Sequence, residues 1–412
     1  MKHAMGNRVM WLVVALCAWV PVGGASADQP NTLSDAQLAQ GWTLLFNGRD
    51  LQGWTTSGDI NAWGVREGEL VIRKPGSGWW LRTDRMYRDF ELTLEFNLSE
   101  GANSGLGLRG SARGDPAFTG FEVQILDSAG DDPAIDGCGA VYNAITPTTQ
   151  AVNPPGEWNT YRVRVQGDTL DVWLNGRHIH DHTALDDRGF FRHEDQLLPL
   201  RDRYTTGYIS LQDHGDAVRF RNIKLLDLSV DPDPGGYTEL SNGRDLDGWT
   251  SLGGGTWSVG EHEILGGAII GRDGPGHLFT KESFGDFELR AMVRVNEHGN
   301  SGLYFRTIPR PQDPDSWPLG YEAQVDQHDP KNFTGCVYDR AWPEHVEGPI
   351  TRDGAWFDYR IRAVGNRIQT WINGVPMVDA RLDDFKEGHF ALQTHHPGNE
   401  VMYRDLRVRE MK

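Results

Sequence analysis

The stretch Tyr161-R-V-R-V-Q-G-D-T-L-D-V-W-L-N-Gly176 decides the fold class of this chain. Apolar and polar residues alternate on both sides of Gly167-Asp168, and a period of two is typical of β-strands with one buried face. Gly167-Asp168 and Asn175-Gly176 are dipeptides that favour tight hairpin turns. The stretch therefore predicts consecutive antiparallel strands.

The same pattern returns as Tyr359-R-I-R-A-V-G-N-R-I-Q-T-W-I-N-Gly374. Other segments repeat at the same offset of about 195–200 positions, far beyond the period of a solenoid, so each copy is a whole domain. The repeated pairs are Trp42–Trp54 with Tyr237–Trp249, Phe90–Phe96 with Phe287–Val293, and Asn103–Arg109 with Asn300–Arg306.

The repeats divide the chain into two domains. We place the first domain at residues 40–229 and the second at residues 237–412, joined by a short turn-forming linker at residues 230–236. Residues 28–39 form a lead-in with a short helix that Ser34 caps. Many short strands in copies of about 190 residues favour an all-β chain with two jelly-roll β-sandwiches in tandem. Because the linker is short, we also expect contact between the two domains.

The composition of the chain limits the kinds of partner that the protein is expected to bind. The 412 residues carry a formal net charge of −18, which argues against a nucleic-acid partner, since phosphate binding requires clustered Lys and Arg. The chain contains 50 Gly and 15 Trp, a combination that suits turns and sugar-stacking surfaces.

The N-terminus has the features of a signal peptide. Lys2 and Arg8 precede the apolar run Met10–Val20, and Ala25-Ser26-Ala27 supplies the small-residue cleavage pattern. We therefore expect cleavage after residue 27, a periplasmic or secreted protein, and no membrane span. The mature chain then keeps only Cys138 and Cys336, which we expect to be buried free thiols, with a disulfide as the alternative.

Polar side chains recur on the predicted outer faces of both copies. In the strand at residues 207–214, Gln212 and His214 face away from the core, and Gln393 and His395 repeat them. In the strand at residues 103–109 the outward positions are two glycines followed by Arg109, which suggests a bare floor with a cation at its end.

A third strand adds a row of polar residues. In the second copy Gly320-Y-E-A-Q-V-Asp326 alternates regularly, with Glu, Gln and Asp on the outer face. The first copy, Gly120-F-E-V-Q-I-L-Asp127, has one additional residue before its Asp. A bulge at Ile125-Leu126 would return Asp127 to the face of Glu122 and Gln124, and we predict this bulge.

These motifs resemble the 3-keto-disaccharide hydrolase family, long known as a domain of unknown function. The resemblance covers about residues 40–228, and the second copy matches more loosely, with a His at position 396 and without most of the segment at 187–206. The motifs that carry it are Leu45–Trp54, Asn103-S-G-L, Phe121–Asp127, Gly156–Tyr161, Trp173-L-N-G and Gly207–Ile223.

The resemblance implies a concanavalin A-like jelly roll and enzymes that act as 3-keto-glycoside lyases, hydratases or hydrolases. Their substrates carry a ketone at C3, which acidifies the C2 proton, so that a base can remove it and the C1 substituent can leave. The resemblance also implies a divalent metal ion, and we expect no nucleotide or organic cofactor.

The polar positions supply the candidate site residues. The catalytic candidates are Glu122, Asp127 and His214; His214 is favoured as the base for its intrinsic pKa, and the same three are candidate metal ligands. Arg109, which could instead be a structural partner of Glu122, joins the substrate-binding candidates Asn103, Gln124, Gln212 and Tyr142. The second domain offers Arg306, Glu322, Gln324, Asp326, Gln393 and His395.

Two other functions remain open. One is a non-catalytic, lectin-like carbohydrate-binding protein. The other is a conventional glycosidase, because Glu-x-Gln-x-x-Asp resembles the Glu-x-Asp-x-x-Glu strand of laminarinase-type enzymes. Retaining hydrolysis requires carboxyl groups about 5–5.5 Å apart. Positions four apart on a strand lie roughly 13 Å apart, so this reading is the weaker one.

Overall fold

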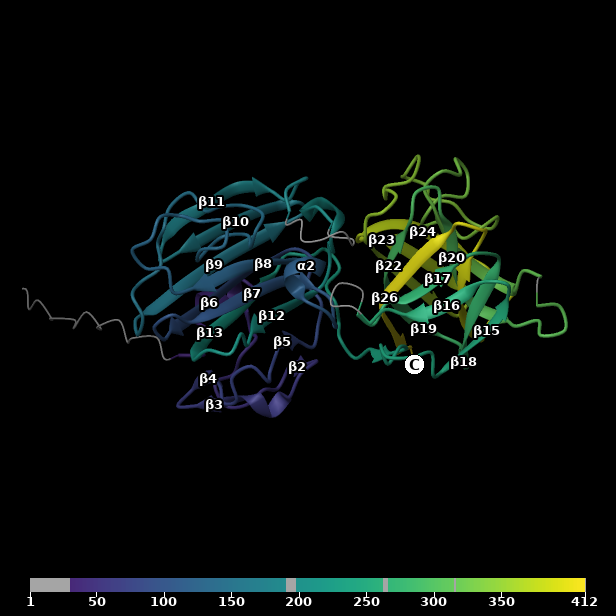
Figure 1. The fold of residues 1–412 in the computed structure, drawn as a ribbon. Coiled ribbons are helices and arrows are strands. Elements are labelled where there is room, and N and C mark those ends of the chain that lie inside the picture. Colours follow the sequence, from purple (N-terminus) through teal and green to yellow (C-terminus); the bar gives the residue numbers. More distant parts are fainter. Residues whose placement is uncertain (1–29, 190–197, 262–265, 315, 412) are drawn as a thin grey trace, which may run out of the picture.

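The computed structural model describes residues 30–189, 198–261, 266–314 and 316–411 (Figure 1). The predicted signal peptide at residues 1–27 lies outside the described residues. The chain folds into two β-sandwiches, one coloured purple to teal and one green to yellow (Figure 1). Each sandwich pairs an eight-stranded with a five-stranded sheet, which confirms the prediction of an all-β chain with two tandem sandwiches.

The first domain contains β1–β13. Its eight-stranded sheet runs in the order β11 (Arg177–Ala184), β10 (Thr169–Leu174), β9 (Trp158–Gln166), β6 (Phe90–Leu98), β13 (Val218–Asp227), β4 (Glu69–Ile72) and β3 (Trp63–Arg66), with β1 (Thr43–Leu44) paired to β13. Its five-stranded sheet runs β2 (Trp54–Thr56), β5 (Trp80–Thr83), β12 (Tyr208–Gln212), β7 (Asn103–Gly110) and β8 (Phe121–Leu126).

The second domain repeats this order with β14–β26. Its eight-stranded sheet runs β16 (Thr256–Val259), β17 (Ile269–Arg272), β26 (Glu400–Glu410), β19 (Phe287–Val295), β22 (Phe357–Val364), β23 (Arg367–Ile372) and β24 (Val375–Arg381), with β14 (Thr238–Glu239) on β26. Its five-stranded sheet runs β15 (Trp249–Gly253), β18 (Gly276–Phe284), β25 (Gly388–Thr394), β20 (Asn300–Ile308) and β21 (Leu319–Asp326).

The stretch at residues 161–176 forms parts of β9 and β10 and the turn into β11. Gly167, Asn175 and Gly176 adopt positive φ angles, which tight hairpin turns require and which Gly and Asn tolerate best. The predicted alternation also holds in the five-stranded sheet, where Leu106 and Leu108 lie in the core and are fully shielded from solvent. The other face of this sheet is thereby left to the polar side chains.

Short helices flank the first domain's sheets. The predicted lead-in helix is α1 (Asp35–Ala39), and Ser34 with Gln37 forms its capping box. A second helix, α2 (Pro116–Thr119), was not predicted; Asp115 caps it, and it connects β7 to β8. Two 3-10 turns, η1 (Ile60–Ala62) and η2 (Leu200–Asp202), complete these elements.

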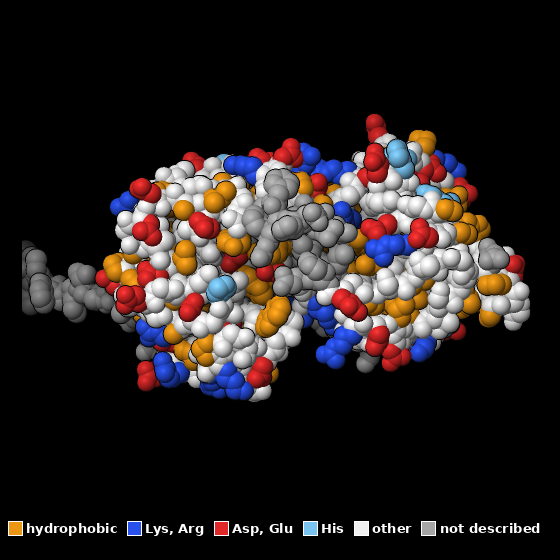
Figure 2. Space-filling model, in the orientation of Figure 1, with side chains coloured by type: hydrophobic (Ala, Val, Ile, Leu, Met, Phe, Trp, Pro, Cys, Tyr) orange, Lys and Arg blue, Asp and Glu red, His pale blue; other side chains and the backbone are white. Residues whose placement is uncertain are grey.

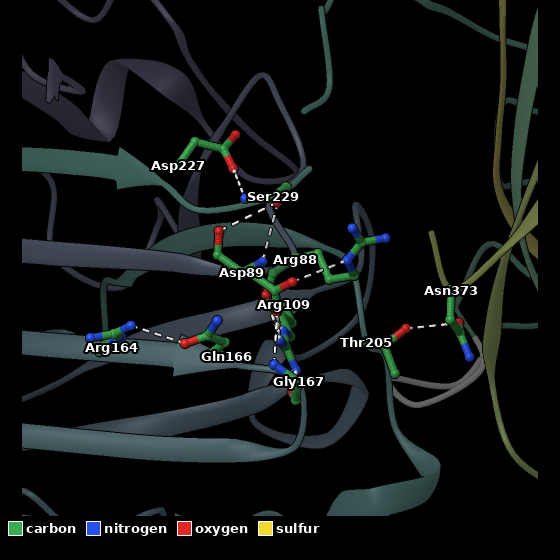
Figure 3. Close-up of polar contacts among 10 residues, drawn as sticks. All are labelled: Arg88, Asp89, Arg109, Arg164, Gln166, Gly167, Thr205, Asp227, Ser229 and Asn373. Atoms are coloured by element: carbon green, nitrogen blue, oxygen red, sulfur yellow. Dashed lines mark hydrogen bonds and ion pairs between the residues drawn. The ribbon is translucent and has the colours of Figure 1, made fainter. Parts of the chain in front are cut away.

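The two domains contact each other through apolar and polar groups. Tyr204 of the first domain packs edge-on against Trp356 of the second, with the ring centroids 5.4 Å apart, inside a cluster of buried apolar side chains. The linker carboxylate of Asp233 pairs with Arg407 at 2.8 Å, and both side chains are buried. Thr205 also donates a hydrogen bond to Asn373 at 2.9 Å (Figure 3).

The remaining general predictions concern thiols, surface and membrane. Cys138 and Cys336 are free and buried, as predicted. Acidic and basic side chains are interspersed on the face of the molecule that Figure 2 shows, without a continuous basic patch on that face. In the described part of the chain, no helix has the length and apolar character that crossing a bilayer requires.

Candidate functional site

In the first domain the polar row lies where β7 pairs with β8. Glu122 is opposite Gly107 and Gln124 is opposite Gly105, and both polar side chains are buried. The Glu122 carboxyl lies over Gly105, because a Cβ atom at that glycine would be only 1.7 Å from Glu122 Oε1. Because Gly105 has no side chain, the Glu122 carboxyl can occupy the space above it.

The predicted bulge in β8 is wrong. The ladder runs without interruption from the pair Leu108–Phe121 to the pair Asn103–Leu126. Leu126 thus occupies the position that Asp326 takes opposite Asn300 in the second domain. Asp127 lies beyond the end of the strand, where its Oδ2 accepts a hydrogen bond from the Gly101 backbone N–H at 2.8 Å. Asp127 therefore secures the turn before β7 and is not part of the row.

The prediction that Arg109 faces a substrate is also wrong. Its backbone has a φ of 53° at a register shift between β7 and β12, and its side chain is buried. Its guanidinium donates to the carbonyl oxygens of Arg88 at 2.7 Å and Gly167 at 2.8 Å, and it pairs with Asp89 (Figure 3). Because the buried group is already bonded to the backbone, it has a structural role.

Arg306 repeats this arrangement in the second domain. It has a φ of 49° and donates to the carbonyl oxygens of Gly285 at 3.0 Å and Gly365 at 2.7 Å. It also pairs with Asp286 at 2.9 Å. Arg306 thus stabilises the second sandwich as Arg109 stabilises the first. Because its guanidinium is bonded to the backbone, we no longer count Arg306 among the ligand-binding candidates.

The other first-domain candidates are spread along the row. Tyr142 adjoins Glu122, because its backbone N–H donates to the Glu122 carbonyl at 2.9 Å. Asn103 has a buried Oδ1 without a hydrogen-bond partner, and Gln212 at the end of β12 is half-buried.

His214 is exposed in the turn after β12. Ser210 on β12 lies opposite Gly107, as Glu122 does on β8. His214 is four positions beyond Ser210 and lies past the end of β12 at Gln212, so it lies further along the row than Glu122. The structure does not bring His214 and Glu122 together.

The second domain places a tyrosine on the floor of its row. Tyr304, opposite Glu322, donates its hydroxyl to Glu322 Oε2 at 2.7 Å. Gln393 Nε2 in turn donates to the Tyr304 hydroxyl at 3.2 Å. The Gln324 amide nitrogen, in the orientation that satisfies both of its polar atoms, donates to Glu322 Oε1 at 3.2 Å. Both oxygens of the Glu322 carboxyl are therefore hydrogen-bonded.

The two carboxyl groups differ in their acidity. Burial, with a contribution from Asp115, raises the pKa of Glu122 well above its ordinary value and so favours the protonated form of this group. Burial also raises the pKa of Glu322, but the hydrogen bonds from Tyr304 and Gln393 oppose the effect and leave it at about 7. Glu322 can therefore both accept and donate a proton near neutral pH.

A cavity of about 500 Å³ lies over the second row, within the size range of small-ligand sites. Its walls include four of the predicted second-domain candidates, Glu322, Gln324, Gln393 and His395. Asp326 lies at the edge of this site, where its carboxylate accepts hydrogen bonds from Asn300 Nδ2 at 2.8 Å and from the His328 backbone at 2.7 Å.

Other residues that line the cavity were not among the predicted site residues. Tyr338 lines the cavity and corresponds to Tyr142, since the backbone N–H of Tyr338 donates to the Glu322 carbonyl. Trp317 and Asn300 also line it. Trp317 comes from the β20–β21 connection, where the first domain has α2 instead.

The predicted metal ligands do not fit a shared ion. Asp127 is held by Gly101, Glu122 is buried over β7, and His214 is exposed further along the row. Among the described residues, the groups close enough to hold an ion are Asp171, His178 and Asp181, and His298, His328 and Asp353. In each group a histidine already contacts an aspartate, at 3.0 Å for His178–Asp171 and 2.7 Å for His328–Asp353.

Comparison with known proteins identifies the family to which this chain belongs. The model of the 3-keto-alpha-glucoside-1,2-lyase-like domain matches residues 41–226 and again residues 236–409. The chain belongs to this family. Both matches fall on the two sandwiches, so the resemblance read from the motifs is confirmed for both copies.

Several known proteins are similar to this chain. A 3-keto-disaccharide hydrolase of Bacteroides thetaiotaomicron is 25% identical over an alignment that covers 45% of this chain and 78% of the relative. A crystal structure from Parabacteroides distasonis, assigned as a glycosyl hydrolase, is 28% identical and covers 49% of this chain and 100% of its own, with a TM-score of 0.42. A carbohydrate-binding module from Bacillus subtilis is 22% identical and covers 42% of this chain, with a TM-score of 0.32.

Proposed function

We propose that this protein cleaves glycosides that carry a ketone at C3, and that its best-formed site is the cavity of the second domain. The observation that carries the proposal is the half-buried Glu322 side chain, whose pKa of about 7 suits proton transfer and which lines a cavity of about 500 Å³. Family membership and the named activity of the Bacteroides relative support the class of substrate.

The proposed reaction is an elimination. The Glu322 carboxylate removes the proton from C2, and the electrons of that bond form an enolate on the C3 oxygen. The enolate then collapses to a double bond between C1 and C2, while the C1–O bond breaks and its electron pair leaves with the aglycone oxygen. Glu322 returns the proton to that oxygen. Addition of water across the double bond would complete a net hydrolysis.

Neighbouring groups can assist these steps. Arg306 is bonded to the backbone, so the enolate would need another donor, and the hydroxyl of Tyr338, an exposed residue that lines the cavity, is the proposed one. In the first domain the corresponding residues are Glu122 and Tyr142. His214 and His395 are proposed to contact the aglycone, because they lie at the far end of each row from the carboxyl.

One experiment separates this function from its alternatives. The wild-type protein, Glu322→Gln and Glu122→Gln are incubated with 3-keto-maltose and with maltose. We expect turnover of the ketone alone, and Glu322→Gln should lower it about 100-fold or more. Cleavage of maltose would indicate a conventional glycosidase, and binding without turnover a lectin-like protein. Loss of turnover in Glu122→Gln alone would transfer the activity to the first domain.

Export is proposed on the N-terminal sequence alone. The pattern at residues 1–27 suits a signal peptide, and a periplasmic or secreted protein would meet glycosides outside the cytoplasm. The N-terminal residue of the mature protein, determined by mass spectrometry after expression with the full leader, tests this proposal. A mature chain that begins at residue 28 is the expected result, and an uncleaved chain would refute it.

A further inference from the structure

The outer wall of the second-domain cavity is built from aromatic rings. The Trp317 indole lines the cavity with 46% of its surface exposed, and it stacks on the His395 ring with centroids 5.2 Å apart and planes 25° apart. The buried His277 ring supports Trp317 edge-on at 5.6 Å. Trp317 is therefore held in position although one face is open.

The wall carries no charge near neutral pH. Burial lowers the pKa of His277 to about 4, and burial with the neighbouring His396 lowers the pKa of His395. Both imidazoles are thus neutral at pH 7, and the wall is an apolar, aromatic surface. Such a surface suits the apolar C–H face of a pyranose ring better than it suits a charged aglycone, which would find no ion-pair partner on the wall.

A polar group beside this wall lacks a partner. Gln393 also lines the cavity, and its side chain is 1% exposed. Its Nε2 donates to Tyr304, whereas its Oε1 is buried and receives no hydrogen bond from any described residue. A buried acceptor of this kind costs stability unless a donor reaches it, and a sugar hydroxyl would supply one.

The position of the wall indicates which part of a substrate it meets. The Tyr304 hydroxyl contacts Glu322 directly, and His277 packs edge-on against Tyr304 at 5.2 Å before it reaches Trp317. Trp317 is therefore separated from the acid–base carboxyl by two aromatic side chains. The ring that loses its C2 proton must lie at Glu322, so Trp317 meets the neighbouring unit.

The row of the first domain is covered in a different way. The connection between β7 and β8 is α2, and Pro116 of this helix closes over the floor: a Cβ atom at Gly107 would be 2.7 Å from Pro116 Cβ and 3.1 Å from the Trp80 ring. The aromatic wall is thus a feature of the second copy and not of the repeated framework.

We propose that Trp317, backed by His395 and His277, forms a subsite for the leaving sugar of a 3-keto-disaccharide, with Gln393 Oε1 accepting one of the substrate's hydroxyl groups. The subsite makes the cavity selective for disaccharides over glycosides with a small aglycone. This inference rests on the proposed function for the identity of the ring at Glu322, whereas the binding surface itself does not depend on it.

The test compares two substrates that differ only in the leaving group, 3-keto-maltose and methyl 3-keto-α-glucoside. Trp317→Ala is measured in the Glu122→Gln background, so that the first domain adds no turnover. We expect kcat/KM for 3-keto-maltose to fall about tenfold, and that for the methyl glycoside to change less than twofold. Trp317→Phe should restore most of the loss, because it keeps an aromatic face.

Trp342→Ala is the matched control, since Trp342 is 40% exposed in the same domain but does not line the cavity. It should leave both substrates unaffected. Equal losses for both substrates, or no loss for either, would overturn the proposal.

If the wild-type protein turns over neither ketone, the proposed function fails, and calorimetry with maltose then tests the subsite alone. Weaker maltose binding in Trp317→Ala would sustain it, and unchanged binding would refute it.

Discussion

At the scale of single residues, the hydroxyl of Tyr304 distinguishes the two acid groups of the molecule. Glu122 and Glu322 occupy equivalent positions, opposite Gly107 and Tyr304 respectively. Only Glu322 receives a hydrogen bond from a floor tyrosine, and its pKa is about 7, whereas that of Glu122 is raised well above its ordinary value. The Tyr304 hydroxyl thus opposes the effect of burial on Glu322 and helps to keep its pKa at about 7.

Replacing Tyr304 by Phe should shift the pH dependence of turnover. The Tyr304 hydrogen bond stabilises the carboxylate and lowers the pKa of Glu322, so its loss must raise that pKa above about 7. Because the carboxylate is the base, kcat/KM should fall at pH 7 and recover at higher pH.

The midpoint of the pH–rate profile checks this result. Tyr359→Phe is the control, since the buried Tyr359 hydroxyl has no hydrogen-bond partner in the described part of the chain, and its removal should leave the midpoint in place. A Tyr304→Phe profile with an unmoved midpoint would show that Glu322 is not the titrating base.

The arginines that recur in the two copies, Arg109 and Arg306, stabilise the fold. Arg109 bonds to the carbonyls of Arg88 and Gly167, so it ties the start of β6 to the β9–β10 turn (Figure 3). Lysine keeps the charge but lacks the planar fork that reaches two carbonyls at once.

Arg109→Lys should therefore lower the free energy of unfolding by about 2–3 kcal/mol, because it leaves buried groups without donors. Urea unfolding measures the loss. The KM of the folded variant for 3-keto-maltose should equal that of the wild type. A stable variant with a raised KM would instead restore Arg109 to the substrate-binding residues.

At the scale of elements, the strand that pairs with the edge strand of each five-stranded sheet, β7 or β20, depends on a glycine beneath the carboxyl. A Cβ atom at Gly105 would lie 1.7 Å from Glu122 Oε1, and one at Gly302 would lie 2.3 Å from Glu322 Oε1. Neither strand can accept a side chain there without moving the acid.

Gly302→Ala should displace Glu322, reduce turnover of 3-keto-maltose and lower stability by about 1–3 kcal/mol, as overpacking of a tight site does. Gly285→Ala is the control, because a Cβ atom there meets no other atom within 4 Å, and it should change stability by less than about 0.5 kcal/mol. Kinetics and thermal unfolding of both variants give the comparison. A fully active Gly302→Ala would show that the carboxyl position is not critical.

The strands were predictable from the sequence because burial on one face imposes a period of two, and the hairpin turns because they need residues that tolerate positive φ. The predictions failed where the alternation of the side chains stops, at the end of a strand or at a residue with a positive φ angle. The bulge was inferred by aligning Asp127 with Asp326, but β8 ends at Leu126 and the turn at Gly101 holds Asp127. The positive φ of Arg109 turns its side chain from the outer face into the interior.

The cavity was not predictable for a related reason. The row residues Glu322, Gln324, Gln393 and His395 recur in sequence, but their access depends on the connection before β21, which has no periodicity to read. In the first domain the corresponding connection forms α2, whose Pro116 covers the floor. The first copy, whose motifs resemble the family more closely, thus has the more covered row.

At the scale of the whole molecule, the linker does more than join two sandwiches. Asp233 accepts a hydrogen bond from the Met86 backbone N–H of the first domain at 3.1 Å and pairs with Arg407 of β26 at 2.8 Å. Burial acts to raise the pKa of Asp233, but Arg407 and Arg290 outweigh it and hold the pKa below its ordinary value. The linker carboxylate is therefore charged and shared by both domains.

This arrangement predicts that the two domains unfold together, and that Asp233→Asn separates them. Removing one partner of a buried ion pair leaves Arg407 uncompensated at the interface, at a cost of about 3–5 kcal/mol. Calorimetry should show one cooperative transition for the wild type and two for the variant. Asp231→Asn removes the neighbouring contact to Arg360, in which the aspartate is 44% exposed, and should cost only about 0–1 kcal/mol. A single unshifted transition in Asp233→Asn would mean that the apolar contact of Tyr204 with Trp356 holds the domains together without the linker carboxylate.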